Sequence, residues 1–226
     1  MNMLDELKKS LVDAAKEAER TDLCKHKSGN FSVFDPESQV VIVTPSGVAR
    51  SELRENQLCV LNLDAQVLAW NGINKPSSEV LMHIAIYKKR PDIGAIVHTH
   101  SRYATAFAIL NKSIPPILYE SFVLGQSPRI PVAPYARPGT SALARSVSST
   151  LQDADCCLLE SHGAIALGAN LEEALLRANY VEELSELYYL TLSINQGREP
   201  KTLAQEELQK WAYPTDIKFP EDDCYN

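Results

Sequence analysis

The sequence has no apolar run long enough to cross a membrane, and it has no CxxC pair, P-loop or GxGxxG fingerprint. A membrane-spanning helix needs about 20 mostly apolar residues. The first twenty residues carry charges throughout, which excludes a secretory signal peptide. The missing glycine-rich motifs argue against nucleotide chemistry. We therefore expect a cytoplasmic protein with no membrane partner.

Basic residues are also too few for a nucleic-acid partner. The 22 Lys and Arg residues face 29 Asp and Glu residues, which gives a net charge of −7. Binding to nucleic acid requires a concentrated basic surface, so nucleic acid is not expected as a partner. An anionic substrate would have to be bound by local donors and a metal ion, because the overall field of the protein repels it.

The cysteines are odd in number and lack metal-ligand spacing. They are Cys24, Cys59, Cys156, Cys157 and Cys224. In a strand the adjacent pair would point to opposite faces. We expect all five to be reduced and structural in a cytoplasmic protein. A catalytic cysteine paired with a histidine is the alternative, and no pattern in the sequence favours it.

What the chain does contain indicates one globular domain of 226 residues, followed from about residue 205 by a polar tail that we expect to be mobile. Hydrophobic periodicity and turn residues predict a mixed or antiparallel sheet covered by helices. Helices are expected over 3–20, 78–90, 102–111, 140–151 and 171–194. Strands are expected over 31–34, 40–43, 59–63, 67–70, 94–100, 156–160 and 164–167. The proline-rich segment 113–139 is expected to be mostly loop with short strands.

Three histidines and one glutamate suggest a metal site. His98 and His100 are two residues apart in a predicted strand, so both side chains project from the same face. His162 lies between two apolar strands, and three imidazoles would leave one position open, as in catalytic zinc sites. Glu79, at a predicted helix start, is a fourth ligand or a base. The alternative is that backbone groups satisfy the strand histidines. We expect His26 and His83 to be structural.

Three separate loops offer small donors for an anion. They are Ser28-Gly29-Asn30, Thr44-Pro45-Ser46-Gly47 and Ser77-Ser78. Glycine lets the backbone approach an anion closely, and a helix N-terminus presents free N–H groups. Ser78 is expected to cap the helix that begins at Glu79. The alternative for each loop is an ordinary turn or cap, since turns favour these residues.

The order of five motifs resembles class II aldolases of the aldolase/adducin type, over about residues 28–195. The motifs are Ser28-Gly29-Asn30, Thr44-Pro45-Ser46-Gly47, Lys75-Pro76-Ser77-Ser78-Glu79, Val97-His98-Thr99-His100 and His162-Gly163. The resemblance implies an α/β (α+β) fold with three αβα layers and a mainly antiparallel central sheet. It also implies a homotetramer with active sites at the subunit interfaces.

The same resemblance implies roles for individual residues. Zn²⁺ would be held by His98, His100 and His162, with Glu79 on or near the metal and acting as the proton carrier. The substrate phosphate would be held by Gly29, Asn30, Ser46, Gly47, Ser77 and Ser78. Tyr119 would exchange a proton with the departing aldehyde across a subunit boundary, unless it is only a loop aromatic packed at an interface. Tyr213 is a looser match to a second tyrosine in the tail.

The implied activity is the reversible cleavage of a ketose 1-phosphate, of the L-fuculose 1-phosphate type, to dihydroxyacetone phosphate and an aldehyde. A sugar-phosphate 4-epimerase would use the same site, but the related epimerases have Ser-Ser-Asp where this chain has Ser77-Ser78-Glu79. A related dehydratase or decarboxylase is a further alternative. A non-catalytic adducin-like module is another, although the three histidines and Glu79 argue against it.

Overall fold

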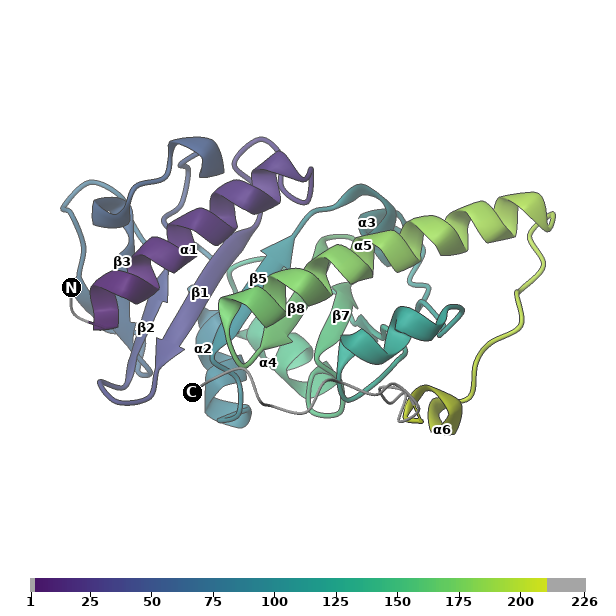
Figure 1. The fold of residues 1–226 in the computed structure, drawn as a ribbon. Helices are drawn as coiled ribbons and strands as arrows, with labels where there is room; N and C mark the ends of the chain where they lie inside the picture. Colours follow the sequence, from purple (N-terminus) through teal and green to yellow (C-terminus); the bar gives the residue numbers. More distant parts are fainter. Residues whose placement is uncertain (1–2, 211–226) are drawn as a thin grey trace, which may run out of the picture.

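The computed structural model describes residues 3–210, and one eight-stranded sheet runs through this part of the chain (Figure 1). The strand order is β4-β3-β2-β1-β5-β8-β7-β6. All neighbouring strands are antiparallel except the parallel pair β6 and β7. The strands are β1 (Asn30–Asp35), β2 (Val40–Val43), β3 (Cys59–Asn62), β4 (Val67–Ala69), β5 (Ala95–Thr99), β6 (Val132–Ala133), β7 (Cys156–Leu159) and β8 (Gly163–Gly168).

Helices cover both faces of the sheet. The α-helices are α1 (Met3–Arg20), α2 (Val80–Lys89), α3 (Arg102–Ile109), α4 (Ser141–Thr150), α5 (Leu171–Ile194) and α6 (Gln205–Leu208). Three short 3₁₀ helices are η1 (Arg50–Glu52), η2 (Glu55–Gln57) and η3 (Tyr119–Leu124). In Figure 1, α1 and α5 cross the front of the sheet, and α2 and α4 lie behind it.

The core is divided by the sheet in the way that strand alternation requires. Val97 and Cys156 pack with the residues of α1, α3 and α5, whereas Ile96 and Cys157 pack with those of α2 and α4. Successive side chains of a strand point to opposite faces, so one sheet supports two apolar layers. The α/β, three-layer, mainly antiparallel arrangement is therefore confirmed. Cys24, Cys59, Cys156 and Cys157 are buried and free of disulfide bonds.

Strand β5 lies in the middle of the sheet and contains His98, one of the predicted metal ligands. It pairs with β1 on one side, where Asn30 lies opposite His98, and with β8 on the other, where Ile165 lies opposite His98. All five residues of β5 are buried. The sheet therefore fixes His98 between the first strand of the chain and the last.

The predicted start of α2 is wrong by about two residues. The helix begins at Val80, and Glu79 occupies the N-cap position with a non-helical backbone. Ser78 does not cap it; instead the Ser77 hydroxyl accepts a hydrogen bond from the Glu79 N–H at 3.3 Å. Because Glu79 lies just outside the helix, its side chain can turn towards β5 rather than follow the helix surface.

The two segments predicted as irregular contain short helices. Residues 119–124 of the proline-rich segment form η3. The tail begins with α6, whose Leu208 is buried and which packs against η3. Tyr213 and Cys224 lie outside the described residues, as does the rest of the tail. Among residues 3–210, no helix is both long and apolar enough to cross a bilayer.

Candidate functional site

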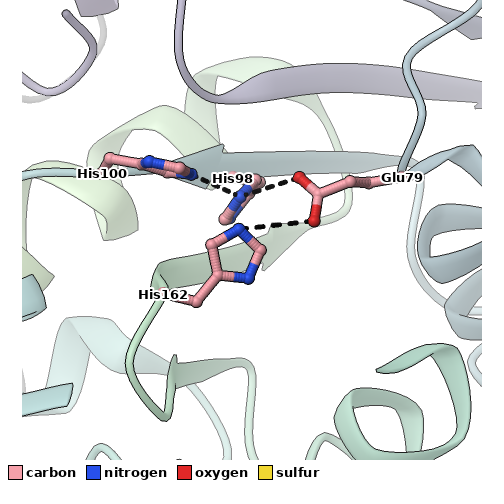
Figure 2. Close-up of side chains that lie close together, drawn as sticks. All are labelled: Glu79, His98, His100 and His162. Carbon is pink, nitrogen blue, oxygen red and sulfur yellow. Dashed lines mark hydrogen bonds and ion pairs between the residues drawn. The ribbon is translucent and has the colours of Figure 1, made fainter. Parts of the chain in front are cut away.

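Four side chains that are far apart in the sequence converge at the end of β5. The ligand atoms of Glu79, His98, His100 and His162 all lie within 4.8 Å of one another, and Figure 2 shows the three imidazole rings turned towards the carboxylate. Glu79 Oε2 is 3.2 Å from His98 Nε2, and Glu79 Oε1 is 3.4 Å from His162 Nε2. His100 Nε2 is 3.1 Å from His98 Nε2. The structure thus brings together all four residues predicted to hold a metal.

The backbone around Gly163 allows this convergence. A Cβ atom at Gly163 would lie 2.3 Å from the Thr99 carbonyl oxygen and 3.1 Å from the His100 ring. Only glycine can therefore sit where β8 begins beside the end of β5. The close approach places the preceding residue, His162, next to His98 and His100 at ring-centroid distances of 4.8 Å and 5.0 Å.

The hydrogen bonding of His98 directs a lone pair into the cluster. Its Nδ1 lies 2.8 Å from the Ala164 carbonyl oxygen, which can only accept, so Nδ1 carries the proton. In the neutral ring, Nε2 then faces Glu79 and His100 with an unshared electron pair. A histidine that binds a metal typically has its other nitrogen held in this way.

Burial keeps the other two imidazoles of the cluster neutral. Together with the neighbouring His98, it lowers the pKa of His100 to about 3 and the pKa of His162 to about 4. Burial alone would raise the pKa of Glu79, but the interactions with His98, His162 and Asn30 outweigh it, so the carboxyl pKa lies well below its ordinary value. Neutral imidazoles and an ionised carboxylate are the protonation states that a metal ion requires.

The unsatisfied atoms of the cluster also fit a cation. Glu79 Oε1 is buried and has no hydrogen-bond partner among the described residues. An unpartnered carboxylate oxygen in the interior is costly unless a positive charge compensates it. Three imidazole nitrogens and one carboxylate oxygen around a common point form a typical ligand set for a divalent transition metal. The residues present therefore fit a metal ion.

A second group of buried residues fixes the orientation of Glu79. Asn30 donates from Nδ2 to Glu79 Oε2 at 2.9 Å, and its Oδ1 lies 2.5 Å from His83 Nε2. The acceptor Oδ1 requires a proton on Nε2, so His83 Nδ1 accepts from Ser32 Oγ at 2.7 Å. Ser32 Oγ in turn lies 2.8 Å from the Tyr87 hydroxyl. The chain of hydrogen bonds holds the Asn30 amide with its NH₂ group towards Glu79.

His83 contributes to this group through a contact that its sequence position does not indicate. It was expected to be structural, and it indeed lies outside the metal cluster, but it contacts Asn30 directly. Glu79 lies just outside α2 and His83 lies within its first turns, and both side chains reach Asn30.

The burial of His83 predicts a pH dependence of stability. Burial lowers its pKa from 6.5 to about 3 in the folded chain. Between these values the unfolded chain binds a proton that the folded chain does not, so stability falls as pH decreases from 6.5 towards 3. His83→Gln, which keeps a donor for Asn30 but cannot titrate, should reduce the slope by about 1.4 kcal/mol per pH unit. Urea unfolding of the metal-free proteins at pH 6.5, 5.5 and 4.5 measures this, and equal slopes would contradict it.

The three loops predicted to bind an anion lie side by side. The Ser77 N–H donates to the Thr44 carbonyl at 3.1 Å, and the Ser46 N–H donates to the Lys75 carbonyl at 2.9 Å. The Thr44 hydroxyl accepts from the Phe31 N–H at 3.1 Å, which ties the same loop to β1. The sheet and these bonds therefore gather the six predicted residues, which are Gly29, Asn30, Ser46, Gly47, Ser77 and Ser78.

Several donors of these loops are open. Among the described residues, the N–H groups of Gly47 and Ser78 and the hydroxyls of Ser46 and Ser78 have no hydrogen-bond partner in the protein. Ser46, Gly47 and Ser78 are exposed, whereas Asn30 and Ser77 are buried. Open donors next to the N-terminus of α2 make this a surface that suits an anion.

Tyr119 is not gathered with the cluster within one chain. It lies on η3, is 56% exposed and stacks on Phe122 at a ring-centroid distance of 6.4 Å. The main packing partners of η3 are α5 and α6. The charge of Glu120 and a hydrogen bond to it raise the pKa of the Tyr119 hydroxyl.

Comparison with known proteins agrees with the geometry of the cluster. Residues 9–189 match the family model described as "Class II Aldolase and Adducin N-terminal domain". The 5-deoxy-D-ribulose 1-phosphate aldolase of Bacillus thuringiensis is 36% identical over 93% of this chain and 95% of its own. The L-fuculose phosphate aldolase of Escherichia coli K12 is 37% identical over 84% of this chain and 86% of its own.

A solved structure supports the same assignment. An L-fuculose 1-phosphate aldolase superimposes with a TM-score of 0.84 at 35% sequence identity, covering 92% of this chain and 94% of that one. Both the sequence and the fold are thus shared along nearly the whole length. The chain belongs to the class II aldolase and adducin family, and within it to the metal-dependent aldolases.

Proposed function

We propose that this protein is a zinc-dependent aldolase that reversibly cleaves a ketose 1-phosphate to dihydroxyacetone phosphate and an aldehyde. The observation that carries the proposal is the convergence of three imidazoles and Glu79 beside loops with open donors. The similar aldolases named above act on L-fuculose phosphate and on 5-deoxy-D-ribulose 1-phosphate. These sugars differ in the aldehyde half, so we propose a substrate of this type without choosing between them.

Zinc is the metal that we propose for the cluster. His98, His100 and His162 would supply three nitrogen ligands, and Glu79 would occupy or border the fourth position. Three protein ligands with one exchangeable position are typical of catalytic zinc sites. When bound, the metal supplies a Lewis acid that polarises the ketose carbonyl and stabilises the charge left after the carbon–carbon bond breaks. A Schiff-base lysine is then unnecessary.

Glu79 would carry the proton of the reaction. Its Oε2 is held by Asn30 and its Oε1 is open, so the carboxylate can accept or donate a proton at the carbon that forms the new C–H bond of dihydroxyacetone phosphate. General acid–base catalysis needs a group within hydrogen-bonding reach and held in a fixed orientation. The Asn30 and His83 hydrogen bonds supply that orientation.

The three loops would bind the phosphate group of the substrate. Asn30 and Ser77 form the buried side of the proposed site, and Ser46, Gly47 and Ser78 form the exposed side, with Gly29 at the turn into β1. The phosphate is remote from the bond that breaks. Binding of such a remote group would hold the substrate at the site equally in the ground state and the transition state.

Tyr119 would complete the site from a neighbouring subunit of a homotetramer. We propose that its hydroxyl exchanges a proton with the aldehyde oxygen. If so, Tyr119→Phe and Glu79→Gln, each inactive alone, should regain activity when the two proteins are unfolded and refolded together. Mixed tetramers then contain sites with both native residues. Absence of any recovery in mixed tetramers, verified by native mass spectrometry, would place Tyr119 outside the neighbour's site.

The function is tested with a panel of ketose phosphates and purified zinc-loaded protein. Release of dihydroxyacetone phosphate, measured by coupling to glycerol-phosphate dehydrogenase, should occur with ketose 1-phosphates such as L-fuculose and 5-deoxyribulose 1-phosphate. The ketose 5-phosphates should not be cleaved. Conversion of L-ribulose 5-phosphate to its 4-epimer, with no dihydroxyacetone phosphate from any ketose 1-phosphate, would replace the aldolase by the epimerase alternative.

A further inference from the structure

We propose that Arg50, buried behind the anion loops, is a positioning residue whose uncompensated positive charge selects a dianionic phosphate at the site in front of it. This inference rests on the proposed function, because it concerns the phosphate of the same substrate. Arg50 lies at the start of η1, three residues after Gly47. Neither its spacing nor its neighbours in the sequence predict a role.

The contacts of Arg50 join two of the three loops. Its Nη2 donates to the Gly29 carbonyl at 2.8 Å and to the Lys27 carbonyl at 3.1 Å, and its Nη1 reaches the Pro45 carbonyl at 3.5 Å. The residues that follow two of these carbonyls, Asn30 and Ser46, are proposed phosphate ligands. The guanidinium therefore lies against the backbone of the loops that present the open donors.

The charge of Arg50 has no direct counter-charge. The side chain is 2% exposed, its Nε has no hydrogen-bond partner, and its guanidinium contacts are all to carbonyl oxygens among the described residues. Burial is the largest influence on its pKa, which it lowers, and nearby Cys24 and Glu19 oppose this only in part. Arginine nevertheless stays protonated in proteins. A buried charge of this kind is expensive unless an opposite charge approaches it.

A bound phosphate dianion would be that opposite charge. Charge interactions in a partly buried site are several-fold stronger than in water, so they act across a layer of backbone. Exposed Lys27 and Lys75 lie in the same loops, but water screens their charges. Among the described residues of these loops and of η1, Arg50 is the buried cation.

The competing explanation is that Arg50 only holds the loops together through its hydrogen bonds. Substitutions that keep or remove its positive charge distinguish the two explanations. Arg50→Lys keeps the charge but loses the planar fork, whereas Arg50→Gln keeps amide donors but loses the charge. Lys27→Gln is the matched control, because it removes the same unit of charge from an exposed position in the same loop. Arg50→Met serves as a second neutral variant.

The experiment measures binding of inorganic phosphate to the zinc-loaded proteins by calorimetry, with folding checked by circular dichroism and zinc content. We expect the Kd of Arg50→Lys within about threefold of the original, that of Arg50→Gln and Arg50→Met raised by tenfold or more, and that of Lys27→Gln raised by less than twofold. With the ketose phosphate, neutral variants should show a higher KM at an unchanged kcat, because the phosphate is bound equally in ground and transition states.

The opposite results would overturn the inference. A neutral variant that folds and binds phosphate as tightly as the original protein would show that the charge has no role. Arg50→Lys binding tenfold more weakly would show that shape decides instead, and this comparison stands even where the neutral variants do not fold. Phosphate binding requires no bond cleavage. A protein that binds phosphate through Arg50 yet cleaves no ketose phosphate would disprove the proposed function and leave this inference intact.

Discussion

Removal of the bound metal should lower the rate of ketose phosphate cleavage by at least about a thousandfold, and one equivalent of Zn²⁺ per chain should restore it. The physical reason is the charge that cleavage leaves on the dihydroxyacetone phosphate half. Within the cluster, Glu79 is an anion and burial holds His100 and His162 neutral, so these three groups supply no positive charge to the reacting atoms. Loss of several kcal/mol of Lewis-acid stabilisation corresponds to a thousandfold or more in rate.

The measurement uses protein dialysed against a chelator, then against metal-free buffer, with metal content determined by mass spectrometry. Phosphate binding provides the control, because none of the six proposed phosphate-binding residues is a proposed metal ligand, and the affinity should stay within a few fold. Full cleavage activity in a protein with less than about one metal ion per hundred chains would remove the metal from the mechanism.

Glu79→Gln should retain zinc but lose about a hundredfold to ten-thousandfold in kcat, the range expected when a general acid–base group is removed. The variant keeps the shape of the side chain, so the hydrogen bond from Asn30 can persist. The three imidazoles remain to hold the metal. KM should change little, because the proposed phosphate loops are untouched.

Stopped assays at equal zinc content measure this effect. Asn30→Asp is not a suitable control, since it would place a second carboxylate against Glu79. Ser32→Ala is a better control, because it removes the hydrogen bond between Ser32 and His83. His83 is separated from Glu79 by Asn30 in the same chain of hydrogen bonds. The kcat of Ser32→Ala should remain within about tenfold of the original, consistent with the loss of one buried hydrogen bond. Unchanged turnover in Glu79→Gln would show that another group carries the proton.

The sheet and the metal cluster could be predicted because their signals are local or periodic. The alternation around His98 and His100 places both side chains on one face, and the apolar strands on either side of His162 place that histidine in a turn. The start of α5 at Leu171 was also predicted, and the side chain of Asn170 caps it by accepting from the Glu173 N–H. Periodicity decides such features, because a strand or helix buries one face.

The features that the sequence could not reveal depend on contacts between distant residues. Arg50 contacts backbone carbonyl oxygens of two loops. Every residue has such a carbonyl, so the sequence does not indicate which ones Arg50 contacts. His83 looked like an ordinary helix residue because its partner, Asn30, comes 53 positions earlier. The start of α2 was misplaced because Ser78 has the character of a cap, whereas the geometry of the cluster requires Glu79 outside the helix. Backbone contacts of this kind leave no periodic signal.

X-ray absorption spectroscopy at the zinc edge tests the central claim most directly, because it reports the ligands of the metal in the intact protein. One zinc per chain with three imidazole nitrogens at about 2.0–2.1 Å and further oxygen ligands is the predicted result. His162→Ala should reduce the imidazole count by one, and His26→Ala, an exposed histidine away from the cluster, should leave it unchanged. A spectrum dominated by sulfur ligands, or unchanged by His162→Ala, would contradict the account.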